Sequence, residues 1–225
     1  MMSEPRAVYR LFQLISPSLP IGGFTYSQGL EWAVEAQWVT DKESMHQWLS
    51  NMLFNSVATL ELPLIDRYCE ALGNADIARI QSLSDTLYAS RETKELRAEE
   101  SQRGLALKTL LVQLGVDHDA FHHPEVKINQ LLGLCVAAEQ WQIEPESLKQ
   151  GYLWSWAENL IMAGVKLVPL GQTDGQRALI ALSDEFEHAI AHARQIEEWM
   201  MGSFTPSVSI ASSLHETQYT RLFRS

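Results

Sequence analysis

Apolar residues recur with a helical period along almost the whole chain, whereas the alternation typical of β-strands is hard to find. The clearest apolar stripe runs from Met45 to Val57. The preceding Thr40-Asp41-Lys42-Glu43 predicts a capping box, in which the Thr hydroxyl and the Glu carboxylate satisfy free backbone amides. Further stripes predict helices within residues 26–38, 64–72 and 77–87. The pattern therefore predicts an all-α fold.

The second half of the chain continues this pattern with longer segments. Residues 90–114 are rich in charged side chains, and Glu99 stands four positions before Arg103, the favourable order for a helical ion pair. Residues 126–138 and 148–168 are apolar on nearly all sides, which is typical of helices in the middle of a bundle. We therefore expect a single-domain multi-helix bundle.

Prolines and polar turns indicate where the later helices begin and end. Pro145 suits the first turn of a helix, and Pro169 forces that helix to stop nearby. Thr173-Asp174-Gly175-Gln176 predicts a second capping box, followed by a last long helix that reaches Ile196.

The organisation changes near residue 202. Residues 1–201 are expected to form the helical bundle domain, and residues 202–225 a flexible linker and docking tail. Residues 202–213 are small and polar with one proline, which favours a linker. The last residues lie at a chain end, where disorder is common, yet they are rich in anchor side chains. These are Tyr219, Leu222 and Phe223, with Arg221 and Arg224 beside them.

Composition and charge narrow the function. A chain of 225 residues with 46% hydrophobic and 20% charged residues can bury a full core. The formal net charge of −11 repels phosphate groups, which disfavours a transcriptional regulator and an anionic membrane surface as partner. Cys69 and Cys135 form neither a disulfide framework nor a thiolate zinc motif. With no signal-peptide pattern and no membrane-length apolar run, the sequence predicts a cytoplasmic protein.

Motifs for catalysis and for cofactors are not found. Residues 25–29 lack the leading glycine of a nucleophile elbow, and residues 171–176 lack the Gly-Lys-Ser/Thr of a phosphate loop. Glu158 and Lys166 are charged residues in the most apolar predicted helix, where a structural ion pair or a lysine reaching solvent explains them. A hydrolase built on Glu158 is the remaining enzymatic alternative. We predict no catalytic residue and no cofactor.

Two groups of histidines are candidate metal ligands, since imidazole suits nickel or zinc. The first group lies in a stretch that is equally well explained as a solvated loop, and the second lies on a polar helix face that needs no metal. The groups are His118, His122 and His123 with Asp117 and Asp119, and His188 and His192 with Glu185. No metal site is predicted.

Short motifs spread in order over nearly the whole chain carry a family resemblance. They are Leu19-Pro20-Ile21-Gly22-Gly23-Phe24 with Ser27 and Gly29-Leu30-Glu31, Ser90-Arg91-Glu92-Thr93 with Gln102-Arg103-Gly104, Pro169 to Gln176, His215 to Tyr219, and Arg221 to Ser225. Each motif alone is weak, but together they are specific. The chain resembles UreF, the urease accessory protein family.

The resemblance implies an all-helical, non-enzymatic scaffold that is a homodimer within its complexes. It implies two partners: UreD, also called UreH, which contacts urease, and UreG, the GTPase that carries nickel. The assembly delivers Ni²⁺ to the lysine-carbamate dinickel site of apo-urease in a GTP-dependent way. The alternative is a metallochaperone that binds nickel directly through surface histidines.

The resemblance also places the candidate partner-binding residues. Glu31 and Glu35 share a face whose simplest interpretation is a solvated surface, and we expect Glu31 to contribute to a polar partner surface. The other polar candidates are Arg91, Glu92 and Lys166, and the tail candidates are His215, Glu216, Tyr219, Arg221, Leu222, Phe223 and Arg224. The tail is expected to become ordered on UreD, with the arginines paired to carboxylates and with Leu222 and Phe223 in a pocket.

Overall fold

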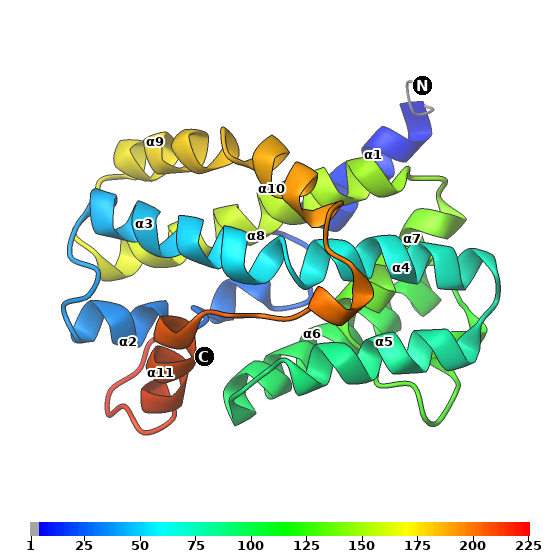
Figure 1. The fold of residues 1–225 in the computed structure, drawn as a ribbon. Helices are drawn as coiled ribbons and strands as arrows, with labels where there is room; N and C mark the ends of the chain where they lie inside the picture. Colours follow the sequence, from blue (N-terminus) through cyan, green and yellow to red (C-terminus); the bar gives the residue numbers. More distant parts are fainter. Residues whose placement is uncertain (1–4) are drawn as a thin grey trace.

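The computed structural model describes residues 5–225. Within this range the chain is built from helices and contains no β-strand, which confirms the predicted all-α class (Figure 1). The buried apolar side chains of these helices form one continuous hydrophobic core. No helix in the described range is both long and apolar enough to cross a membrane.

The longest helix, α8, lies at the centre of the bundle. It packs against α1, α2, α3, α4, α7 and α9, as its nearly uniform apolar surface predicts (Figure 1). The α-helices are α1 (Pro5–Ile15), α2 (Leu30–Glu35), α3 (Lys42–Met52), α4 (Glu61–Gly73), α5 (Ile77–Ala89), α6 (Lys94–Gln113), α7 (Gln130–Gln140), α8 (Pro145–Leu167), α9 (Gln172–Ser183), α10 (Phe186–Ala193) and α11 (Pro206–His215). Short helical turns are η1 (Gly23–Thr25), η2 (Leu53–Val57), η3 (Asp119–Phe121) and η4 (Glu198–Met200).

The start of α3 differs from the prediction by one residue. The N-cap is Asp41, whose carboxylate accepts a hydrogen bond from the Ser44 amide at 2.8 Å. The Ser44 hydroxyl in turn accepts a hydrogen bond from the Asp41 amide at 3.1 Å. Aspartate and serine therefore close the capping box in place of the predicted Thr40 and Glu43.

The predicted last long helix is broken in two. The capping box predicted at Thr173 is not used, because α9 begins at Gln172 without a side-chain cap. The helix ends at Ser183 and α10 begins at Phe186. At the break, Glu185 accepts a hydrogen bond from the Ser50 hydroxyl at 2.6 Å, so that the chain is fastened to α3 where it changes direction.

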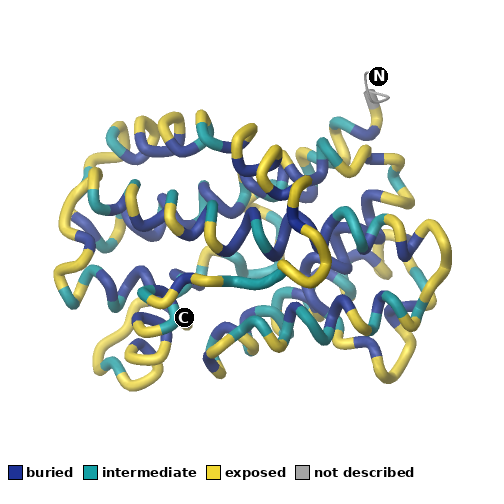
Figure 2. The backbone as a smooth tube through the Cα atoms, viewed as in Figure 1, coloured by how far each residue is buried: buried dark blue, intermediate teal, exposed yellow. Residues whose placement is uncertain are grey.

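The helices are buried on the faces that turn inward and exposed on the faces that turn outward (Figure 2). A polar network lies within this core. Asn129 is the N-cap of α7, and its amide donates hydrogen bonds to the Tyr68 hydroxyl at 3.0 Å and to the Ser84 hydroxyl at 3.2 Å. One asparagine thus joins α4, α5 and α7, which fixes the start of α7 four residues later than the apolar pattern suggests.

Gly104 allows α6 to approach the backbone at Asn129, and we predict that Gly104→Ala is strongly destabilising. A Cβ atom at Gly104 would lie 2.5 Å from the Asn129 Cα. Because backbone must move to relieve this overlap, we expect the free energy of unfolding to fall by about 2 kcal/mol or more in urea denaturation. At Gly73 a Cβ would meet nothing within 4 Å, so Gly73→Ala is the matched control. Equal effects of the two substitutions would contradict the close approach.

The irregular linker expected over residues 202–213 differs from the structure. The amides of Gly202 and Phe204 donate hydrogen bonds to the carbonyls of Thr59 at 3.2 Å and Asn55 at 2.8 Å. From Pro206 the chain forms α11, because proline suits a first helical turn and the small residues that follow pack against α2. The division of the chain at residue 202 stays a prediction.

Candidate partner-binding site at the C-terminal segment

The C-terminal segment, residues 206–225, folds back onto α2 and onto the start of α6 (Figure 1). At the start of α6, the Thr93 and Ser212 hydroxyls share a buried hydrogen bond of 2.8 Å. Gly29 has a φ of 84°, and a Cβ there would lie 3.1 Å from the Ser212 amide nitrogen. Glycine is therefore required at this position by both its backbone conformation and the close approach of α11.

Glu31 is the main anchor of the C-terminal segment. Its two carboxylate oxygens accept hydrogen bonds from the backbone amides of Leu222 at 2.6 Å and Phe223 at 2.9 Å. Glu31 is buried, so the solvated surface that was its simplest interpretation is wrong for this residue. Glu35, one turn later on α2, is exposed as expected.

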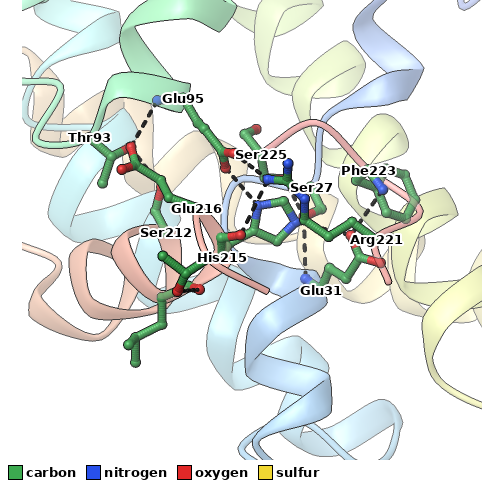
Figure 3. Close-up of polar contacts among 12 residues, drawn as sticks. Ser27, Glu31, Thr93, Glu95, Ser212, His215, Glu216, Arg221, Phe223 and Ser225 are labelled. Carbon is green, nitrogen blue, oxygen red and sulfur yellow. Dashed lines mark hydrogen bonds and ion pairs between the residues drawn. The ribbon is translucent and has the colours of Figure 1, made fainter. Parts of the chain in front are cut away.

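His215 lies between two carboxylates, as Figure 3 shows. Its Nδ1 atom is 2.6 Å from an oxygen of Glu95, and its Nε2 atom is 3.0 Å from an oxygen of Glu31. The ring is fully buried. Each ring nitrogen thus has a carboxylate oxygen as its hydrogen-bond partner. The residue therefore links α2, α6 and α11 by hydrogen bonds as well as by packing.

Two further residues of the segment, Glu216 and Arg221, bind at the start of α6. The Glu216 carboxylate accepts hydrogen bonds from the amides of Lys94 at 2.8 Å and Glu95 at 3.2 Å. A negative charge at a helix N-terminus is favoured by the helix dipole. Arg221 pairs with the Glu95 side chain, on the oxygen that His215 leaves free.

The last residues complete the attachment (Figure 3). Ser27 donates from its amide at 2.8 Å and from its hydroxyl at 2.5 Å to the Ser225 backbone oxygen. The Arg224 amide donates to the Thr25 carbonyl at 2.9 Å. The Phe223 ring joins the hydrophobic core, with the Lys166 Nζ atom 5.8 Å from the ring centroid. Lys166 thus contacts the segment as a cation over an aromatic ring.

Most candidate partner-binding residues therefore lie together at the C-terminal segment, but Arg91 and Glu92 differ from each other. Arg91 points inward, where it binds Glu61 at 2.7 Å and Glu100 at 2.6 Å. Glu92 is exposed and accepts a hydrogen bond from the Ser209 hydroxyl of α11 at 2.9 Å. Only Glu92 of this pair faces the C-terminal segment.

The residues of the helical body that bind the C-terminal segment were not predicted from the sequence. Glu95 binds both His215 and Arg221, and Ser27 binds the end of the chain. Ser27 stands in a motif that carries the resemblance, whereas Glu95 is one of many charges in residues 90–114. No pattern within one helix distinguishes a carboxylate that binds a distant segment from one that is solvated.

The outer surface of the segment is apolar and exposed. Tyr219 is 98% exposed and Leu222 is 65% exposed, whereas the neighbouring Phe223 is only 6% exposed. Ile210 and Leu214 of α11 are exposed as well. The predicted anchor pair is thus divided between two surfaces: Phe223 fills a site in its own chain, and Leu222 points outward.

A small cavity near Arg91 bears on the enzymatic alternative. Its volume of about 30 Å³ holds one or two water molecules, far less than the several hundred Å³ typical of ligand pockets. The charged lining residues include Glu61, Arg91, Glu92, Glu99 and Glu100. Glu158 lies outside this lining, and partial burial raises the pKa of its carboxyl group. This cavity is therefore not a substrate site for Glu158.

The candidate metal ligands do not converge. In the described part of the chain, no group of three or more His, Cys, Asp or Glu side chains is arranged to hold a metal ion. The His122 Nε2 atom binds Asp117 at 2.8 Å, and this hydrogen bond lowers the pKa of the Asp117 carboxyl. His118 accepts a hydrogen bond from the Ala120 amide at 3.1 Å, which supports the loop interpretation. Glu185 faces His46 on α3 at 2.9 Å.

Comparison with known proteins places the chain in a family. The family model described as UreF matches residues 39–183. A urease accessory protein UreF from Alcanivorax borkumensis is 48% identical, with 97% of this chain and 98% of that protein aligned. The protein of the same name from Dechloromonas aromatica is 42% identical, with 96% of this chain and 96% of that protein aligned. The one from a Pseudomonas putida strain is 43% identical, and the two chains align over their full lengths. This chain belongs to the UreF family of urease accessory proteins.

Proposed function

We propose that this chain is a non-catalytic scaffold that bridges UreD, or UreH, and the GTPase UreG. In this role it supports GTP-dependent insertion of Ni²⁺ into apo-urease. The single observation that carries the proposal is the C-terminal segment, which holds an exposed apolar surface in one conformation on the helical body. The residues that fix the segment and those that point outward are different, as a docking element requires.

The surface chemistry supports a protein partner. Tyr219 and Leu222 project from a segment that is held before Tyr219 by the contacts of His215 and Glu216. From Leu222 onward it is held by Glu31 and Ser27. Large side chains on a preorganised backbone lose little entropy on binding, and they are typical anchors of protein interfaces. Exposed Arg224, two residues after Leu222, offers a cation to a carboxylate-bearing rim of the partner. We propose that UreD covers this surface.

The polar candidates support a second contact surface. Glu92 is exposed at the junction of α6 and α11, and Lys166 is exposed at the end of α8. Both contact the C-terminal segment, so the affinity of a partner bound there would depend on whether the segment is docked on the helical body. We propose that UreG contacts this edge.

We also propose that two copies act together within the complex. A two-fold interface presents every surface patch twice, which suits a GTPase that acts as a dimer. The scaffold then needs no bond-making chemistry of its own. The alternative is a direct nickel carrier that uses surface histidines, and the described range holds no group of three or more His, Cys, Asp or Glu side chains arranged for a metal ion.

The experiment is reconstitution of urease activation with apo-urease, UreD, UreG, nickel, bicarbonate and GTP. We compare mixtures with no scaffold, with this chain, and with its Tyr219→Ala/Leu222→Ala variant. Because both side chains are exposed, the variant should keep its helical content and unfolding midpoint. Its affinity for UreD should fall by about 2 kcal/mol, or about thirtyfold, and activation should fall with it.

Two outcomes decide the proposal. Equal urease activity with and without this chain would overturn the scaffold function. If the double variant activates urease fully and keeps its affinity for UreD, the surface around Tyr219 and Leu222 is not the docking surface. An Ile180→Ala variant on exposed α9 serves as the control for loss of a surface apolar side chain outside the segment.

A further inference from the structure

The two cysteines, far apart in the sequence, lie at one turn of the helix pair α4 and α7. These helices pack directly against each other. The Cys135 sulfur of α7 lies 3.8 Å from the Ile65 carbonyl oxygen of α4. Ile65 stands four residues before Cys69, and a helical side chain leans toward the preceding turn. The Cys69 thiol therefore points toward the place where the Cys135 thiol lies.

The two thiols differ in exposure and in acidity. Cys135 is buried, and burial raises its pKa well above the ordinary value. Cys69 is partly exposed, and the hydrogen bond from the Cys135 thiol lowers the pKa of Cys69. Lys149 lowers it slightly, while burial and the charges of Asp66 and Glu139 oppose this shift. Because the thiolate is the nucleophile, Cys69 is the more reactive of the two.

We propose that Cys69 and Cys135 form a peroxide-responsive disulfide, with Cys69 as the attacking residue and Cys135 as the resolving residue. The Cys69 thiolate attacks one oxygen of a hydroperoxide, the O–O bond breaks, and Cys69 becomes a sulfenic acid while alcohol or water leaves. The Cys135 sulfur then attacks the Cys69 sulfur and loses its proton, and water leaves as the S–S bond forms. In total two thiols are oxidised by two electrons and one peroxide is reduced.

The location predicts what this oxidation changes. The disulfide would join α4 to α7, which lie at the end of the molecule away from α11 in Figure 1. The C-terminal segment should therefore stay in place, so the inference is independent of the proposed function. The chain contains only these two cysteines, so an intramolecular disulfide can have no other pairing. In a reducing compartment such a bond would form transiently, under oxidative load.

The test uses the purified full chain, titrated with hydrogen peroxide and analysed by mass spectrometry without reduction. We expect a mass lower by two hydrogens, loss of both thiols, one peptide that links Cys69 to Cys135, and full reversal by dithiothreitol. Cys135→Ala should instead accumulate a Cys69 sulfenic acid that dimedone traps, and Cys69→Ser should leave Cys135 unreacted. Circular dichroism checks that both variants remain folded.

Three results on the natural chain would overturn the inference, whatever the variants do. They are a Cys69 sulfinic acid without the cross-linked peptide, a disulfide between two chains through Cys69, and retention of both thiols under peroxide that oxidises a small-molecule thiol. Adding dimedone before peroxide should divert the natural chain from the disulfide to a Cys69 adduct. A dimedone adduct on Cys135 would reverse the proposed roles of the two residues.

Discussion

Glu31→Ala is expected to lower the free energy of unfolding by about 3–5 kcal/mol, because it removes the carboxylate partner of the buried His215 ring and of two backbone amides. The substitution removes the carboxylate that faces the buried His215 ring at 3.0 Å. It also leaves the amides of Leu222 and Phe223 without their acceptor. Unpaired buried donors each carry a desolvation cost. Chemical denaturation of the purified chain measures the loss.

The same substitution should free the end of the chain. Without Glu31 the segment keeps the Glu95 contacts of His215 and Arg221, but it loses the anchor between them and Phe223. We expect faster amide exchange and faster proteolysis after residue 215, together with weaker UreD binding. Glu35→Ala, an exposed glutamate one turn later, is the matched control and should change neither property.

Two results separate stability from partner binding. If Glu31→Ala unfolds the body entirely, the Tyr219→Ala/Leu222→Ala variant still tests the docking surface, since it removes no anchoring contact. If Glu31→Ala leaves the unfolding midpoint and the exchange rates unchanged, Glu31 is not the main anchor of the C-terminal segment.

Removal of residues 214–225 would delete part of the core together with the proposed docking surface. His215, Phe223 and Ser225 are buried, and Phe223 belongs to the core. We therefore expect the deletion to destabilise the helical body as well as remove the proposed UreD contact, so that substitutions of exposed residues are the cleaner experiment.

The helical period was sufficient to predict the class of fold and most of its central elements. Pro145 begins α8 and Glu99 pairs with Arg103 at 2.6 Å, because local sequence alone determines such features. Helix ends that depend on distant residues were predicted less well. The start of α7 is fixed by Asn129, whose amide reaches α4 and α5, and the break before α10 is fixed by a contact of Glu185 with α3.

The C-terminal segment shows the limit of composition as a guide. Residues 202–213 are small and polar, which favours a linker, yet small size is also what allows α11 to approach Gly29. The anchor character of the last residues was evident from Phe223 and its neighbours. Their target was not, because complementarity between Glu31 and two backbone amides requires knowledge of the tertiary fold.

Arg91→Met is expected to lower the free energy of unfolding by about 3–5 kcal/mol, although Arg91 was predicted as a partner-binding residue. The Arg91 side chain is 12% exposed and neutralises Glu61 and Glu100 at once. Methionine keeps an unbranched apolar stem but leaves both carboxylates unpaired, and one Glu61 oxygen already lacks a hydrogen-bond partner. Urea denaturation measures the effect, with Arg177→Met, at a pair on the surface, as the control.

The cause can be separated from lost packing with a second variant. Adding Glu61→Gln and Glu100→Gln to Arg91→Met removes the unpaired charges while keeping the side-chain volumes nearly constant, so we expect part of the lost stability to return. No recovery would indicate that Arg91 acts through its packing. If Arg91→Met instead keeps full stability and loses UreG or UreD binding, the residue contributes to partner binding as the sequence predicted, through a rearrangement that exposes it in the complex.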